Sequence, residues 1–297
     1  MSDTNKLGER ALSMLDALAS ITAEPGRITR LYLTPEHRRA ADLVAEWMRT
    51  IDLDVSEDAL GTVRGARRSG AGGSNKRLLI GSHIDTVINA GKYDGTLGVV
   101  AGILAIEEIE RRGVKLPFGL EVVAFGDEEG VRFPTTLTSS AALAGTLDLA
   151  ALDAVDPAGV SMRQALIAYG KEPAEIHAAA LDPESLVGYV ELHIEQGPVL
   201  EHHGNPLGVV TSIAGQSRFQ VTVKGVAGHA GTVPMRLRHD AFAASAELAV
   251  AIERIALEFE ASALVATIGM MSVKPGASNV IPDEVTFSLD IRAAQDP

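Results

Sequence analysis

The first half of the chain alternates between segments of helical spacing and short apolar runs. Apolar residues recur every three or four positions in residues 7–20 and 35–50, which predicts two amphipathic helices. Thr34 and Pro35 suit the cap and the first position of the second helix. Residues 95–112 turn from apolar to charged along a third predicted helix.

Two continuous apolar runs flank that third helix. RLLIGSHIDT at 77–86 and FGLEVVAFGDEE at 118–129 are typical of strands buried on both faces. Residues 140–180 predict small helical or irregular segments, and GYVELHIE at 188–195 alternates as a third strand. Because strand, helix, strand is the order of a parallel unit, we predict an α/β fold with a mostly parallel sheet.

The pattern changes near residue 210. Four further elements are expected: a strand at 218–225, an Ala-rich helix over roughly 239–260, and strands at 263–273 and 284–292. Their clean alternation favours a sheet with one exposed face. We therefore predict a larger domain at 1–210 and a smaller α+β domain at 211–297.

Composition and charge limit the classes of partner and of metal site that are compatible with the chain. With 46% hydrophobic residues among 297, the chain can bury the cores of two domains. A formal charge of −13 opposes binding to nucleic acid and to anionic membranes. Because the chain has no cysteine, any metal ion is held by His, Asp and Glu. The polar start and the lack of a long apolar run predict a cytoplasmic protein.

Side chains able to bind metal gather where the predicted strands end. His83, Glu128 and Glu129 follow the two apolar runs. Asp94 stands just ahead of the third helix, and His193 lies in the third predicted strand. The carboxyl ends of parallel strands share one edge of a sheet, where ligands bind. Imidazole and carboxylate ligands suit a pair of zinc, manganese, cobalt or nickel ions, which needs a bridging carboxylate, for which Asp94 is the candidate.

His83, Glu128 and Glu129 are each also compatible with a purely structural role. His83 alone would be a loop histidine, but Asp85 is placed to orient its imidazole from two residues away. The adjacent Glu128 and Glu129 are compatible with a solvated turn. Two neighbouring carboxylates that end a buried strand repel each other unless a cation or a proton engages them, which favours metal binding by one and base chemistry by the other.

The candidates in the second half of the chain carry weaker signals when each residue is considered alone. His193 would by default be a core histidine, yet the glutamates two residues before and after it share its alternation, which a purely structural strand rarely shows. Glycines on both sides of His229 allow the backbone to approach a ligand closely. Asn279 and Arg292 carry little signal alone, and Arg292 is equally compatible with a surface salt bridge.

Taken together, the motifs resemble a known family. Five ordered motifs carry the resemblance: SHIDTVINAGKYDG, GDEEGVRFP, YVELHIEQGPVLE, AGHAGTVPM, and the pair ASNVIP and LDIR. They are similar to those of the N-carbamoyl-L-amino-acid hydrolase and allantoate amidohydrolase group, within the superfamily of aminoacylases and dinuclear zinc carboxypeptidases. The histidine of HIEQG, where peptidase relatives have a carboxylate, favours the carbamoylase branch.

This resemblance implies a dinuclear metallohydrolase domain with an inserted, smaller lid and dimerisation domain. By analogy, His83, Asp94 and His193 would hold one metal ion, and Asp94 and Glu129 would hold the other. Glu128 would be the general base.

The resemblance also implies how substrate is bound. Gln196, His229, Asn279 and Arg292 match positions that bind substrate in the group, with His229 also contributing to catalysis. His229 and Asn279 often reach the site from the partner subunit of a homodimer. The expected reaction is hydrolysis of the ureido C–N bond of a small carboxylate, releasing ammonia and carbon dioxide.

Two departures from the group's pattern stand out. Ser139, Ser140 and Ala141 occupy a stretch where relatives commonly carry an arginine. The group also continues beyond the LDIR strand into a segment that supplies a last histidine ligand, and this sequence ends at Pro297. We therefore expect the second metal site to be weak and the 297 residues alone to be inactive. Two other functions stay open: an aminoacylase or dipeptidase acting on an amide, and a non-catalytic fragment.

Overall fold

The computed structural model describes residues 3–70 and 72–294. Its contacts divide the chain into two compact units, Met1–Pro198 and Val199–Pro297. The predicted boundary at 210/211 falls inside the second unit, and the assignment of a catalytic and a dimerisation domain stays a prediction. Among the described residues, no helix is long and apolar enough to cross a membrane.

The first unit contains the helices and strands that the sequence predicts, together with an additional hairpin. Its elements are α1 (Asp3–Ala19), α2 (Pro35–Thr50), β1 (Asp54–Glu57), β2 (Val63–Arg67), β3 (Arg77–His83), α3 (Thr96–Arg111), β4 (Gly119–Phe125), α4 (Thr138–Leu143), α5 (Met162–Ala168) and β5 (Leu186–Val190), with short 3₁₀ turns at Leu149–Asp153, Pro173–Ala179 and Pro183–Ser185.

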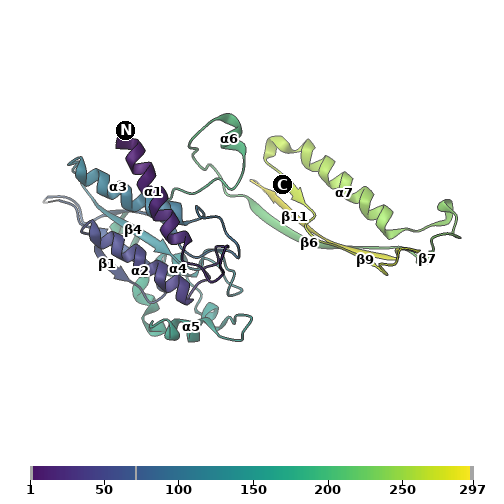
Figure 1. The fold of residues 1–297 in the computed structure, drawn as a ribbon, viewed down its shortest axis with the longest axis horizontal. Helices are drawn as coiled ribbons and strands as arrows, with labels where there is room; N and C mark the ends of the chain where they lie inside the picture. The colour runs from purple at the N-terminus through teal and green to yellow at the C-terminus, as the bar shows by residue number, and fades with distance from the viewer. Residues whose placement is uncertain (1–2, 71, 295–297) are drawn as a thin grey trace. The chain divides into compact units, whose positions relative to one another are not determined.

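The sheet of this unit is mixed. Its strand order is β1-β2-β4-β3-β5. Figure 1 labels β1 and β4 of this sheet. β3 runs parallel to β4 and to β5, whereas β1 with β2 and β2 with β4 are antiparallel. The expectation of a mostly parallel sheet is thus corrected: it holds for β3, β4 and β5 only. The cause is the hairpin of β1 and β2, because a short turn can join only antiparallel neighbours.

The main core lies between α1, α2 and α3 and one face of the sheet. Alternate residues of β4, such as Leu120 and Val122, point into it, while Val123 and Phe125 point to the opposite face. The start of α2 is as predicted: the Thr34 side chain accepts a hydrogen bond from a backbone N–H at 3.3 Å, and a proline occupies the first turn.

The third predicted strand is shorter than expected. β5 ends at Val190, whose partner on β3 is Ile80, so His193 lies beyond the strand. The ladder stops because the chain crosses the start of α3, where a Cβ on Gly98 would stand 2.4 Å from the Leu192 carbonyl oxygen. His193 is therefore carried by a segment without regular structure.

The second unit begins with the predicted strand and helix and ends with the predicted last strand, but the strand expected at 263–273 is divided into two, Val265–Thr267 and Met271–Lys274, and two further short strands are additional. Its elements are α6 (Val199–His203), β6 (Gly215–Lys224), β7 (Gly228–His229), α7 (Ala241–Glu258), β8 (Val265–Thr267), β9 (Met271–Lys274), β10 (Val280–Ile281) and β11 (Glu284–Ala293), with 3₁₀ turns at Met235–Leu237 and Glu260–Ser262.

The long strand β11 organises that unit. It pairs with β6 on one side and with β8 and β9 on the other, all antiparallel. Val221 and Val223 of β6 pack with Val285 and Phe287 in its small core, whereas Phe219, which strand alternation places on the same face, is half exposed. β7 and β10 form a separate two-stranded ladder.

Candidate metal centre

The parallel pairing of β3 and β4 brings the first candidates together. His83 is the last residue of β3 and lies opposite Phe125, the last residue of β4. Glu128 and Glu129 follow three and four residues after Phe125. The strand ends therefore place a buried imidazole beside two half-buried carboxylates, as the sequence predicts.

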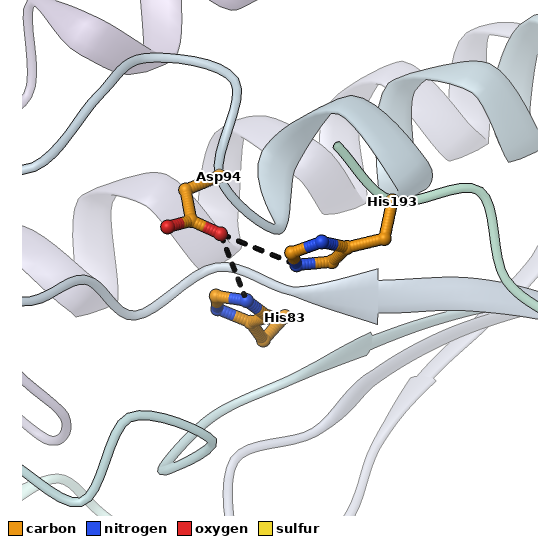
Figure 2. A group of neighbouring side chains, drawn as sticks. All are labelled: His83, Asp94 and His193. Carbon is orange, nitrogen blue, oxygen red and sulfur yellow. Dashed lines mark ion pairs between the residues drawn. The ribbon is translucent and has the colours of Figure 1, made fainter. Parts of the chain in front are cut away.

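Asp94 links the two histidines (Figure 2). Its Oδ1 lies 3.2 Å from Nε2 of His193 and 3.9 Å from Nε2 of His83. The two imidazole rings face each other at 27° with centroids 5.7 Å apart. Gln196, a predicted substrate residue, donates its Nε2 amide to the Asp94 carboxylate at 3.1 Å. Two nitrogens and a carboxylate oxygen thus converge from three segments distant in sequence.

The acidic pair completes the cluster. Oε2 of Glu128 lies 3.8 Å from Nε2 of His83. One ligand atom from each of His83, Glu128 and Glu129 falls within 4.8 Å of the others, and the same holds for His83, Asp94 and His193. Burial raises the pKa of both Glu128 and Glu129, and the field of His83 only partly offsets this.

Asp85 has a larger role than the sequence indicates. Its backbone oxygen lies 3.0 Å from Nδ1 of His83, and its carboxylate lies 3.5 Å from the same atom. The carboxylate also accepts the backbone N–H groups of Glu128 and Glu129, at 3.2 Å each. Asp85 therefore holds the His83 imidazole in a fixed position relative to residues 127–129, which we call the acidic turn. Although burial opposes protonation, Asp85 and then Glu128 raise the pKa of His83 to about 9.

The acidic turn is held from the other side as well. Asp127 has the left-handed backbone angle φ of 58°, and its carboxylate accepts the Thr138 hydroxyl at 2.6 Å. The Ser139 hydroxyl donates to the backbone oxygen of Gly126 and accepts its N–H. The Ser139–Ala141 stretch therefore begins with a residue that secures the end of β4.

The donor set fits divalent metal ions. Oε1 of Glu129 is buried and has no hydrogen-bond partner among the described residues, which is the condition of a carboxylate oxygen placed to bind a cation. At Gly95, whose φ is 65°, a Cβ would stand 2.4 Å from the His83 ring. The close approach of the ring therefore requires glycine at this position. His, Asp and Glu are the ligands expected when cysteine is absent.

A cavity of about 510 Å³ opens beside this cluster within the first unit. Its apolar wall comes from β3, β4, α4 and the turn before β5, and its polar rim includes His83, Glu128 and His193. Sites for small molecules commonly combine such a wall with a few polar groups.

The remaining candidates lie in the second unit. His229 and Asn279 are neighbours, because β7 pairs with β10 and the N–H of Ala230 donates to the Asn279 backbone oxygen at 2.9 Å. Arg292 lies near the far end of β11 and donates its Nε to Asp290 at 3.0 Å. From Glu284 to Arg292 the strand advances eight residues, about 26 Å at roughly 3.3 Å per residue. Arg292 is thus separated from the His229 and Asn279 pair.

Comparison with known proteins decides the family. The model of peptidase family M20/M25/M40 matches residues 79–283. The chain belongs to this family. It is 43% identical to an allantoate deiminase of Arabidopsis thaliana, over 98% of this chain and 59% of that protein. It is 44% identical to an N-carbamoyl-L-amino acid amidohydrolase of Geobacillus stearothermophilus, over 96% and 69% of the two chains.

Solved structures give the same result for the fold. A hydantoinase/carbamoylase family amidase from Burkholderia ambifaria superposes with a TM-score of 0.88 at 38% identity. The alignment covers 97% of this chain and 69% of that one. The M20 family chain therefore spans about three fifths to two thirds of the length of the relatives it matches.

Proposed function

We propose that the protein containing this chain is a metal-dependent amidohydrolase that cleaves the ureido C–N bond of a small carboxylate. The substrate is an N-carbamoyl-L-amino acid or allantoate, and the products are ammonia, carbon dioxide and the amine. The observation that carries this proposal is that two groups of candidate ligands share His83 at the end of β3: one adds Asp94 and His193, and the other adds Glu128 and Glu129. The names of the matched relatives support the choice of bond.

The proposed metal ligands are His83, Asp94, Glu129 and His193, with Asp94 between two divalent ions. When bound, such ions lower the pKa of water and polarise a carbonyl group. Zinc, manganese, cobalt and nickel all suit the His and carboxylate donors.

Glu128 is proposed as the general base. Its raised pKa keeps it basic enough to accept a proton from the attacking water and acidic enough to return it. The proton then goes to the leaving nitrogen as the C–N bond breaks. Gln196, whose side-chain amide donates to Asp94, is proposed to turn one amide N–H toward a substrate oxygen.

Residues of the second unit are proposed to bind the substrate. The Arg292 guanidinium suits a bidentate contact with the substrate carboxylate, and His229 suits the developing oxyanion. Arg292 lies about 26 Å along β11 from Glu284, which begins the strand at the end nearer Asn279. One small substrate therefore cannot contact both Arg292 and Asn279 within a single chain. This separation supports a homodimer in which His229 and Asn279 serve the partner's substrate.

The test is an assay of ammonia release by the full-length protein. The protein is freed of metal, reloaded with zinc, manganese, cobalt or nickel, and given allantoate, N-carbamoyl amino acids, an N-acetyl amino acid or a dipeptide. We expect ammonia from a ureido substrate in the presence of metal. Hydrolysis of only the N-acetyl amino acid or the dipeptide would replace this proposal with the aminoacylase alternative, and undiminished turnover after exhaustive chelation would contradict the metal site.

A further inference from the structure

The segment that carries His193 is not held by the sheet. β5 pairs with β3 only as far as Val190 and Ile80, and the chain from residue 191 to Pro198 has no ladder hydrogen bonds. Strand pairing therefore does not fix the His193 imidazole relative to His83, which ends β3 with 2% of its surface exposed. Some other contact must therefore set the distance between the two rings.

Glu191 makes that contact. The Ser82 hydroxyl donates to its Oε1 at 2.5 Å, and the Tyr189 hydroxyl donates to its Oε2 at 2.8 Å. Ser82 directly precedes His83 in β3, and Glu191 stands two residues before His193. The carboxylate thus joins the backbone beside one imidazole to the backbone beside the other.

The chemistry of this bridge suits an anchor. Hydrogen bonds from hydroxyl groups to an ionised carboxylate are short and roughly twice as strong as neutral ones. Both oxygens of Glu191 are used, and neither group of candidate metal ligands found among the described residues includes it. Gln196 holds the other end of the same segment through Asp94.

We propose that Glu191 is a positioning residue that sets the separation of His83 and His193 by bridging β3 to the segment after β5. The inference rests on the proposed function in one respect, because it takes the two histidines as metal ligands. It assigns Glu191 no contact with metal or substrate. Its effect is on the affinity for metal, through the geometry of the ligands.

The experiment compares Glu191→Ala with Glu191→Gln in the full-length protein. Metal affinity is measured without substrate, by competition with a chromogenic chelator. Partners that orient metal ligands typically contribute 10–100-fold in affinity, so Glu191→Ala should weaken binding by roughly tenfold or more. Glu191→Gln should remain near the wild-type value, because its carbonyl oxygen accepts one hydroxyl and its amide can donate to the other. Tyr189 keeps a partner in either case, since its hydroxyl lies 3.1 Å from the Gly81 oxygen.

Two further proteins act as controls. Glu46→Ala removes an exposed carboxylate from α2 and should leave affinity unchanged. The double variant Ser82→Ala with Tyr189→Phe leaves Glu191 in place but removes both donors, and it should reproduce the loss seen in Glu191→Ala. It also keeps the test decisive if Glu191→Ala does not fold.

Three results would overturn the proposal. Equal loss in Glu191→Gln and Glu191→Ala would mean that the charge itself is needed, as in a ligand or a proton carrier. Wild-type affinity in Glu191→Ala, or in the double variant, would mean that the bridge does not set the ligand geometry. Since affinity is read without substrate, failure to release ammonia from ureido compounds would count against the proposed function alone.

Discussion

The two units place their candidate residues in different ways. In the first unit, the metal candidates come from four segments and form two groups that share His83, and the buried carboxylate of Asp85 joins His83 to the turn that carries Glu128 and Glu129. In the second unit, the candidates lie toward opposite ends of one long strand, and the Arg292 side chain is about half exposed. The first arrangement is built before any ligand arrives, whereas the second has contacts still to make.

This difference corresponds to two structural requirements, one for metal binding and proton transfer and one for substrate recognition. Metal ions and a proton carrier need ligand atoms fixed to within a fraction of an ångström, which requires rigid strands and buried hydrogen bonds. Recognition of a substrate carboxylate needs exposed charge that can close on it. We therefore expect changes in the first unit to affect metal content and turnover, and changes in the second unit to affect substrate binding.

Glu128→Gln should produce the largest effect. The amide keeps the size of the side chain but cannot carry a proton, so turnover should fall by roughly 10²–10⁴-fold with metal content unchanged. Glu129→Gln is the matched variant and should lose metal instead. Turnover and metal content measured on both proteins check this, and the reverse pattern would exchange the roles of the two residues.

Mixed subunits test whether the second unit acts across a dimer. Glu128→Gln and His229→Ala subunits should each be inactive alone, but in the proposed dimer a hybrid would have one site with Glu128 from one chain and His229 from the other. With random pairing, half the dimers are hybrids with one working site of two, giving about a quarter of wild-type activity. Co-expression with two affinity tags isolates the hybrid, and an inactive hybrid would place His229 in its own subunit's site or outside any site.

The same contrast shows what could be read from the sequence. Apolar runs and helical spacing predicted β3, α3 and β4, and with them the meeting of His83 with the acidic pair, because parallel strands end at one edge. The position of His193 outside β5 was not predictable, since its alternation resembles a strand and the close packing of Leu192 on Gly98 of α3 joins segments far apart in the sequence. The β1 and β2 hairpin, too short and polar to stand out, was likewise missed.

Gly95→Ala tests how firmly the first unit holds His83, with Gly231→Ala beside His229 of the second unit as the matched control. A Cβ at Gly95 would lie 2.4 Å from the His83 ring on a backbone with φ of 65°, whereas one at Gly231 would lie 3.3 Å from the His229 ring. Displacing His83 should weaken metal binding by roughly tenfold or more. Gly231→Ala should leave metal affinity unchanged. Chelator competition on both proteins measures this, and tight binding by Gly95→Ala would show that His83 is not held by its neighbours.

Arg292→Lys should raise KM for the ureido substrate with a smaller change in kcat. A lysine keeps the charge but not the two-pronged contact, and loss of one charged hydrogen bond of about 1.5–3 kcal/mol corresponds to roughly tenfold or more. Arg218 on β6 also pairs with Asp290, so Arg218→Lys is the matched control and should change little. Steady-state kinetics decide, and an unchanged KM in Arg292→Lys would leave Arg292 as a surface ion pair.

The smallest effect on metal binding and turnover is expected at His37, which supports the stability of the first unit without touching the proposed ligands. Its ring is fully buried, with Nδ1 2.7 Å from the Tyr169 hydroxyl. Burial, reinforced by Arg30 and Arg38 and opposed by Asp85, lowers the pKa of His37 to about 3. Only the unfolded chain then takes up this proton between pH 6.5 and about 3.

The histidine therefore contributes stability that is present above pH 6.5 and is lost as the pH falls, at about 1.4 kcal/mol per pH unit. His37→Gln, which has no such proton, should unfold with a free energy that depends less steeply on pH in this window. Urea unfolding of both proteins with chelator present measures the difference, with exposed His177→Gln as the control. If the free energies of unfolding of wild type and His37→Gln change with pH in the same way, His37 takes up its proton in the folded protein as well. Solvent would then reach the His37 ring more readily than its buried position beside Tyr169 indicates.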